Sequence, residues 1–261
     1  FAMQDATIKW LVASLPVWQI LFCRSAVLVG GCLASGGRPL VRRVAQTRAG
    51  GLILLRGTVT LAAWFCYFTA ARSLPLGELA TLWFIAPVVV ALLAAPLLGE
   101  RVGPGRWAAI GAGFAGSVVI AAPAQMELST PTALVLAGAG LWGCGVILTR
   151  KIAQQEPSLV QMLANNAFFM VATGIGTALT WQDISLAHAG LLLMVSIFGG
   201  LGQYCMFESA RLAPASLIAP MEYTALIWAF ALGFVVWGDQ PPPHVYAGAT
   251  LILLAGMVLM I

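Results

Sequence analysis

The side chains most able to do chemistry in this sequence are a few charged residues inside long apolar stretches. A charge at the centre of a bilayer costs roughly 3 kcal/mol on insertion scales, so it persists there only when it is paired, hydrated or needed for function. Asp5 and Lys9 are four residues apart. That spacing places both on one helix face and favours an ion pair, or a gate in which one of them meets another helix.

Two arginines lie in such stretches at different depths. Arg24 is about 12 Å from the start of its helix at 1.5 Å per residue, so it needs a partner within the membrane. We expect it to be either a structural hydrogen-bond node or the partner of a substrate carboxylate. Arg56 lies nearer a helix end, and we expect it to reach the surface by snorkelling.

Two acids are set deeply in the second half of the chain. Glu208 lies three residues before Arg211, which favours a local ion pair over a role in coupling. Glu222 follows Pro220, which removes a helix hydrogen bond and can open backbone carbonyls to a cavity. Burial favours the neutral form of a carboxyl group, as a proton-linked carrier requires. We therefore expect a functional role for Glu222.

Aromatic side chains recur at helical spacing in the same stretches. They are more often plain helix packing, but buried Trp and Tyr carry polar groups that need partners, and membrane aromatics usually gather at the interfaces rather than deeper. These residues therefore form a candidate lining for a cavity that holds an amphipathic solute. The expected substrate-binding set is Trp64, Tyr67, Trp83, Trp142, Gln203, Tyr204, Glu222 and Tyr223. The expected gating or coupling set is Asp5, Lys9, Arg24, Glu208 and the helix-bending Pro87 and Pro220.

The elements that must position these residues are membrane-spanning helices. Of 261 residues, 61% are hydrophobic and 8% are charged, which leaves too little polar surface for a water-soluble globule. A spanning helix needs roughly 20 mainly apolar residues. We count nine such spans after a leading fragment, 1–13, which is interpreted as the second half of another helix. The spans are 16–34, 51–71, 77–98, 106–123, 132–150, 158–179, 190–210, 215–237 and 244–261.

The charged loops indicate an orientation. When successive loops are assigned to alternate sides of the membrane, Lys9 and Arg72 are the only basic residues on one side. The other, basic side is expected to face the cytoplasm, and both termini lie on it. The basic side carries Arg38, Arg42, Arg43, Arg48, Arg101, Arg106, Arg150, Lys151 and Arg211. We expect the bacterial cytoplasmic (inner) membrane. Since the five cysteines lie in apolar runs without metal-ligand spacing, neither disulfides nor a metal or other cofactor is expected.

The second half of the chain repeats the first. The segment 66–75 matches 205–214 at an offset of 139, with five of ten pairs identical, and the same offset carries Gly99 onto Gly238. The halves 1–124 and 125–261 would each hold five helices, and an odd number forces the second copy to enter the membrane inverted. Inverted repeats with a site near the midplane are typical of secondary transporters.

These features resemble the EamA family of the drug/metabolite transporter superfamily, and the resemblance covers essentially the whole chain. It is carried by the run 3–10, Arg72 before Pro75, Gly99-Glu100-Arg101, and the pairs 219–220 and 222–223. The resemblance implies an all-α fold of ten transmembrane helices in two inverted five-helix repeats around a central cavity. Similar proteins include YddG-like exporters of aromatic amino acids.

We therefore expect a secondary transporter that exports small amphipathic metabolites, most of all amino acids including aromatic ones, by alternating access. Its expected partners are the solute, the lipid bilayer and a candidate coupling proton, with no nucleic acid, as a monomer or a homodimer. The alternatives are an uptake carrier for a nucleoside-like or cofactor-like metabolite, a passive channel, and an intramembrane enzyme.

Several patterns weigh against an enzyme. The two histidines, His188 and His244, lie near helix starts at the membrane edge, and no H-E-x-x-H sequence occurs. The sequence G-x-G-x-x-G occurs at 111–116 and 138–143, but both lie inside spans, where small residues favour close helix packing rather than nucleotide binding. No P-loop sequence for ATP hydrolysis is present either.

Overall fold

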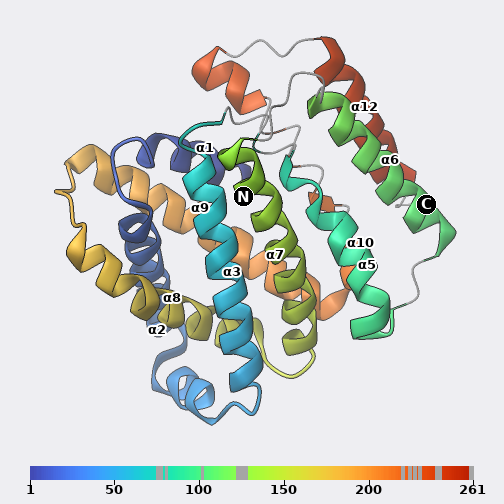
Figure 1. The fold of residues 1–261 in the computed structure, drawn as a ribbon. Helices are drawn as coiled ribbons and strands as arrows, with labels where there is room; N and C mark the ends of the chain where they lie inside the picture. Colours follow the sequence, from blue (N-terminus) through green and yellow to red (C-terminus); the bar gives the residue numbers. More distant parts are fainter. Residues whose placement is uncertain are drawn as a thin grey trace. The chain divides into compact units, whose positions relative to one another are not determined.

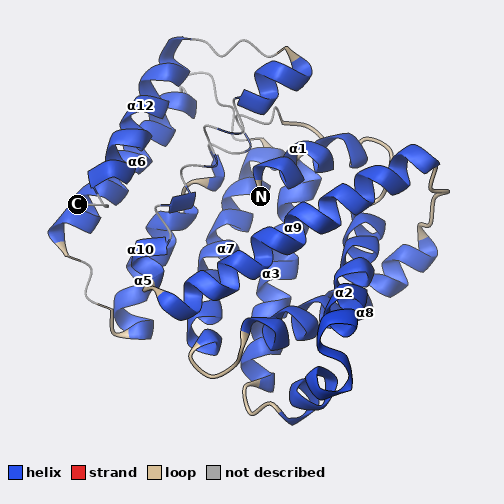
Figure 2. Ribbon diagram, turned by 180° about the vertical axis from the view of Figure 1, so that it is seen from behind, coloured by secondary structure: helices blue, strands red, loops and turns tan. Residues whose placement is uncertain are grey.

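The structure is a computed structural model that describes residues 1–74, 79, 82–100, 103–121, 129–218, 221–222, 225, 228, 231–238 and 243–258. All regular structure in these ranges is helical, and they contain no strand (Figure 2). Five of the helices, found by searching these residues alone, are long and apolar enough to cross a membrane: α2, α3, α7, α8 and α9. The chain is therefore an integral membrane protein, and its regular structure within the described ranges is all helical.

The helices follow one another along the chain as coloured in Figure 1. They are α1 (Ala2–Leu11), α2 (Val17–Gln46), α3 (Gly50–Ala70), α5 (Ala86–Leu98), α6 (Pro104–Ala121), α7 (Thr130–Ala153), α8 (Ser158–Leu179), α9 (Leu186–Leu212), α10 (Ala215–Ile218), a π-helix (Gly233–Trp237) and α12 (Pro243–Val258).

Most described helices agree with the spans expected from the sequence. The span 158–179 coincides with α8, and α1, with 10 residues, is too short to cross, as expected of the fragment. The spans 77–98 and 215–237 are tested only in part, because several of their residues lie outside the described ranges. The span 16–34 agrees with the part of α2 that precedes a kink at Gly37, whereas the helical segment beyond the kink, which continues to Gln46, was not expected.

The chain divides into two compact units, which are described separately. The first unit comprises residues 1, 3–61 and 148–212, and the second comprises residues 2, 62–147 and 213–261. In the first unit α2 packs against α8 and α9. Its core is an apolar cluster formed by Leu28, Cys32, Leu40, Val160, Met162, Leu163 and Phe207.

Glycines permit the close approach of helices in the first unit. A Cβ on Gly176 would lie 2.6 Å from the Trp18 ring, and one on Gly57 would lie 2.7 Å from the Phe168 ring. Small residues at such crossings let helices pack in lipid, where no hydrophobic force draws them together.

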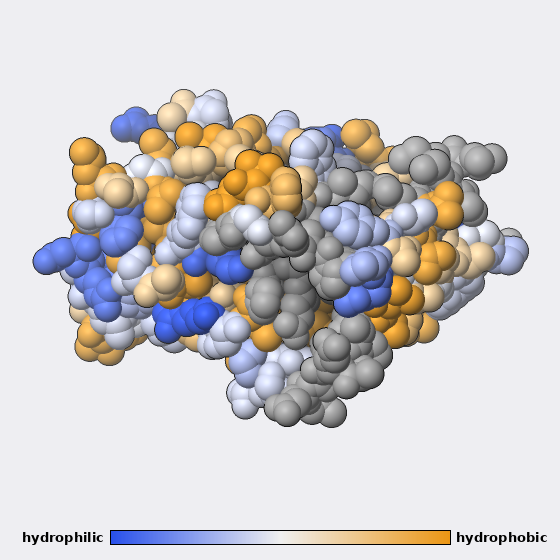
Figure 3. All heavy atoms as spheres, turned by 90° about the horizontal axis from the view of Figure 1, so that it is seen from above, coloured by the Kyte–Doolittle hydropathy of each residue, from blue (hydrophilic) through white to orange (hydrophobic). Residues whose placement is uncertain are grey.

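Apolar side chains face outward from the first unit. On α8, Val171, Ile175 and Leu179 recur every four residues and are 74%, 76% and 80% exposed. One helix face is thus apolar and uncovered, which suits contact with lipid chains. Figure 3 likewise shows apolar atoms at the surface of the face that it draws.

In the second unit, α6 packs against α12, and α5 packs against α6 and α10. The helices ending at Leu98 and Trp237 finish in the same way: Gly99 has φ 68° and ψ 17°, and Gly238 has φ 70° and ψ 18°. A left-handed residue after the last helical turn favours glycine, which has no Cβ to clash. The two glycines are the pair related by the sequence offset of 139.

The extension of α2 begins at a kink. Gly37 has φ 55° and ψ −154°, a backbone conformation essentially restricted to glycine, and Pro39 follows it. Beyond the kink, Leu40 enters the apolar cluster of the first unit and Val44 packs against that cluster. These two contacts explain why 38–46 is helical although its sequence reads as a charged loop.

Replacing Gly37 by alanine should therefore destabilise the protein. The Cβ would be strained at this φ and ψ, at a cost of about 1–3 kcal/mol. Gly30→Ala is the control, because Gly30 lies in the regular part of α2 and an added Cβ meets nothing within 4 Å. Thermal unfolding of the purified protein in detergent should show a lower midpoint for Gly37→Ala alone. Equal midpoints for the two variants would contradict this account of the kink.

Candidate functional site

Four aromatic side chains of the expected substrate-binding set form one cluster in the second unit. The ring centroids of Trp64 and Trp142 are 5.5 Å apart, and those of Trp83 and Trp142 are 6.0 Å apart. Tyr67 contacts Trp83 edge-on, with centroids 4.7 Å apart and planes at 70°. Trp64 and Trp83 are stacked, with centroids 6.5 Å apart. The structure thus brings together aromatic residues from α3, α7 and the turn of helix before α5.

A carboxylate joins this cluster. The Trp142 indole Nε1 lies 3.3 Å from both carboxylate oxygens of Glu222, and donates its hydrogen to them. Trp142 and Glu222 are both partly buried, whereas Trp64 and Tyr67 are buried, with 8% and 5% of their surfaces exposed. The carboxyl group of Glu222 therefore has an indole N–H as a hydrogen-bond donor in partly apolar surroundings.

Glycines on α7 allow the cluster to form. A Cβ on Gly138 would lie 3.1 Å from the Ala63 carbonyl oxygen and 3.1 Å from the Trp83 ring, and one on Gly143 would lie 2.8 Å from Val89. Close packing is thus confirmed at these two glycines of the G-x-G-x-x-G sequence. Gly140, the third, faces open space.

Pro87 lies in the first turn of α5, directly after an interruption of the helix. Residues 82–83 are helical, residues 84–85 form a turn, and α5 restarts at Ala86. Because proline has no N–H, it fits the first turn of a helix but not its interior. The bend expected at Pro87 corresponds to this interruption, next to Trp83.

The aromatic faces and the carboxylate together can bind a cation. The face of an indole ring attracts a cation by about 0.5–2 kcal/mol, and the Glu222 carboxylate supplies the opposite charge. Trp83 and Trp142, which are only partly buried, can offer ring surface to apolar parts of the same ligand. Among the described residues, no group of three His, Cys, Asp or Glu side chains could hold a metal ion.

Two further members of the expected substrate-binding set, Gln203 and Tyr204, belong to the first unit. Gln203 is 8% exposed, and its Oε1 accepts a hydrogen bond of 3.1 Å from Asn166 Nδ2. Tyr204 is 39% exposed. Tyr223 and Pro220 lie outside the described residues.

A second polar junction lies in the first unit around Arg24, which is 2% exposed. A Cβ on Gly199 would collide with Gln4 and lie 2.9 Å from Arg24 Nε, so the three residues adjoin. Asp5 is near enough to Arg24 to act on it electrostatically. Gln4 was not among the expected site residues. It is a polar residue within the apolar fragment, and the Gln4 side chain is fully buried.

The prediction that Arg56 snorkels to the surface is wrong. The prediction that Glu208 forms a local ion pair with Arg211 is confirmed. Arg56 is 4% exposed, and its guanidinium carbon lies 4.3 Å from the centre of the Phe207 ring, so it does not snorkel. A cation over an aromatic face is stabilised without reaching water. Glu208 pairs with Arg211, whose Nη1 lies 2.9 Å from a carboxylate oxygen.

The comparisons with known proteins agree with a membrane transporter. The EamA-like transporter family matches residues 1–122 and 130–261. The chain belongs to this family. A solved crystal structure matches its fold with a TM-score of 0.76 at 18% identity, covering 98% of this chain and 93% of the other.

Proteins similar in sequence to this chain are named as exporters or transporters of different solutes. The pseudopaline exporter CntI of Pseudomonas aeruginosa is 26% identical over 99% of this chain and 91% of its own length. A riboflavin transporter of Rhizobium johnstonii is 27% identical over 72% and 63%. A probable terminal-alkyne amino-acid exporter of Streptantibioticus cattleyicolor is 29% identical over 87% and 78%. These names indicate transporters rather than enzymes.

The packing of α7 on α5 gives a test of how the site is held. Gly143→Ala should be less stable than Gly140→Ala by about 1–3 kcal/mol, because the new Cβ would overlap Val89. Both substitutions raise helix propensity equally. The difference in stability between the two variants therefore reports the contact of the new Cβ with Val89. Thermal unfolding, followed by near-ultraviolet circular dichroism of the tryptophans, measures the stability of each variant. Equal stability of the two variants would show that α7 does not pack closely on α5.

Proposed function

We propose that this protein is a secondary transporter that moves small amphipathic metabolites, most of all amino acids including aromatic ones, out of the cell. The observation that carries the proposal is the Glu222 carboxylate, which lies in contact with Trp142 in a cluster of aromatic rings. Such a site suits a solute with an ammonium group and an apolar side chain. Alternating access would expose it to each side of the membrane in turn.

The relatives' names support export of such a solute without fixing it. Two of the similar proteins are named exporters, and one of these is named for an amino acid. Uptake of a cofactor-like metabolite is the second candidate, favoured by the likeness to riboflavin transporters and by ring faces that could stack on a flat aromatic solute.

We further propose ten transmembrane helices in two inverted repeats, 1–124 and 125–261, with a central cavity between the repeats. The shared conformation of Gly99 and Gly238 supports this, because equivalent helices then end alike. Gln203, Tyr204 and Tyr223 remain candidate substrate-binding residues, and Asp5, Lys9, Arg24, Glu208, Pro87 and Pro220 remain candidates for gating or coupling.

Contacts between segments at or near helix ends support the alternation of sides. The carboxylate of Glu100 accepts hydrogen bonds from the backbone N–H groups of Ala215 and Ser216, at 2.9 and 3.1 Å. In the same way, Thr47 donates to Glu156, and Gln19 and Gln182 exchange two bonds. The two segments in each contact are ones that the alternating topology places on the same side of the membrane. We propose that the arginine-rich side and both termini face the cytoplasm of a bacterium.

Amino-acid exchange by purified protein in liposomes tests this proposal. We expect uptake of labelled amino acid against unlabelled amino acid inside, and a drop of at least tenfold for Glu222→Gln, because the amide has no negative charge for the ammonium group. Asp183→Asn, an equivalent change in an exposed loop, should leave exchange unchanged.

Two outcomes would contradict the proposal. If no amino acid in a broad panel moves faster than in empty vesicles, the amino-acid assignment is wrong. If Glu222→Gln exchanges amino acid like the unmodified protein, with the same pH dependence, Glu222 neither binds the solute nor carries a coupling proton.

A further inference from the structure

A cavity of about 690 Å³ lies in the first unit, where the kinked end of α2 meets the turn between α7 and α8. It is lined by Arg38, Pro39, Arg42, Arg43, Gln46, Thr47, Gln155 and Glu156. Three cationic side chains thus surround it with one carboxylate. Amide groups of two glutamines add hydrogen-bond donors that can meet an anion.

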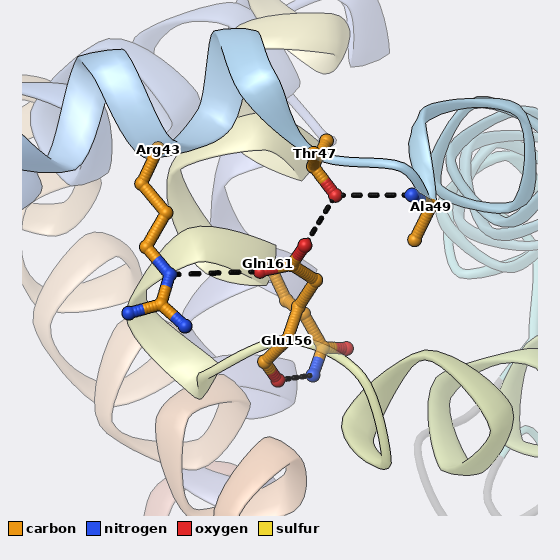
Figure 4. Close-up of polar contacts among 5 residues, drawn as sticks. All are labelled: Arg43, Thr47, Ala49, Glu156 and Gln161. Carbon is orange, nitrogen blue, oxygen red and sulfur yellow. Dashed lines mark hydrogen bonds and ion pairs between the residues drawn. The ribbon is translucent and has the colours of Figure 1, made fainter.

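The one carboxylate of this cavity is already engaged (Figure 4). The Thr47 hydroxyl donates to Glu156 Oε1, and Arg43 Nε lies 3.7 Å from Oε2. Gln161 Nε2 donates to the backbone oxygen of Glu156 at 3.2 Å, which fixes the turn. In Figure 4 no dashed line joins the two terminal nitrogens of Arg43 to Glu156 or to the other residues drawn. They remain available to a second anion.

Arg38 and Arg42 carry the rest of the positive charge. They lie four residues apart, on one face of the helical segment beyond Gly37, and both are exposed. Neither has an ion-pair or hydrogen-bond partner among the described residues of the chain. Leu40 and Val44 hold this segment on the apolar cluster of the first unit, so the arginines project from a fixed element.

An apolar groove of about 380 Å³ lies between α2, α8 and α9 of the same unit. It is lined by Val27, Leu28, Gly31, Cys32, Ser35, Leu159, Met162, Ser196, Ile197, Gly200, Leu201 and Tyr204. On α2 the groove ends at Ser35, three residues before Arg38, and on α8 it ends at Leu159, three residues after Glu156. A Cβ on Gly31 would meet nothing within 4 Å, so the glycine keeps the groove open.

We propose that this groove and cavity bind one anionic phospholipid of the bilayer. The phosphate lies between Arg38 and Arg42, which can each donate two hydrogen bonds to its oxygens, and an acyl chain lies in the groove along α2. Charge selects the headgroup, because a net cationic cavity repels the choline of a zwitterionic lipid. The groove selects a lipid over a soluble phosphate, because only a lipid places an apolar chain there.

Native mass spectrometry of the protein in mild detergent tests the proposal, with phosphatidylglycerol and phosphatidylcholine of the same chains as probes. We expect tighter binding of phosphatidylglycerol, and a loss of roughly 10- to 30-fold in its affinity for the Arg38→Gln/Arg42→Gln variant. The control is Arg48→Gln/Lys151→Gln, which removes two exposed cations that do not line the cavity. It should bind phosphatidylglycerol like the unmodified protein.

A second variant tests the groove and leaves every charge in place. Gly31→Phe should fill the groove and lower the affinity for phosphatidylglycerol several-fold, with thermal unfolding confirming that the variant is folded. Glycerophosphoglycerol, the same headgroup without acyl chains, should bind at least tenfold more weakly than the lipid.

Three results would overturn the proposal. The first is equal affinity for the two lipids, and the second is an equal loss in the control variant, which would indicate unspecific attraction. The third is binding of glycerophosphoglycerol as tight as that of the lipid, which would indicate a site for a soluble phosphate.

Discussion

In the hydrocarbon of a bilayer, a polar group without a partner costs several kcal/mol, and this constraint decides where the few charged side chains of this protein lie. Three of those that the structure describes have a contact that offsets part of the cost of burial. Glu222 accepts the Trp142 N–H, and Arg56 lies over the Phe207 ring. Arg150 donates to the backbone carbonyls of Ala210 and Arg211 at the end of α9, where helix carbonyls have no partner of their own.

The same constraint gives the glycines their importance. Since lipid chains are as apolar as leucine, helices associate in a membrane through close packing and through their polar contacts. Gly138 and Gly143 bring α7 against α3 and α5, and so bring Trp142 to the other rings of the cluster. Gly199 makes room for Gln4 and Arg24 in the first unit. Close helix packing and polar contacts thus depend on each other both in the aromatic cluster and around Arg24.

The sequence predicted most helices to within a few residues, because a spanning helix is a run of apolar residues and its ends are charged or contain proline. It also named Trp64, Trp83 and Trp142 as candidate lining of one cavity; their rings lie in one cluster, and the substrate-binding role stays a prediction. The sequence did not predict features that depend on a contact with a residue distant along the chain. The helix beyond Gly37 depends on Leu40 packing, and the burial of Arg56 depends on Phe207, which is distant in sequence.

We propose that the two halves of the chain have opposite orientations in the membrane. Labelling of single cysteines, placed after α5 and after the π-helix in a chain whose five native cysteines are replaced, tests this orientation. Gly105→Cys and Pro243→Cys suit this purpose, because both positions are exposed. A membrane-impermeant maleimide applied to intact cells should label Pro243→Cys, and should label Gly105→Cys only after the cells are opened. Labelling of both positions from the same side would contradict the account.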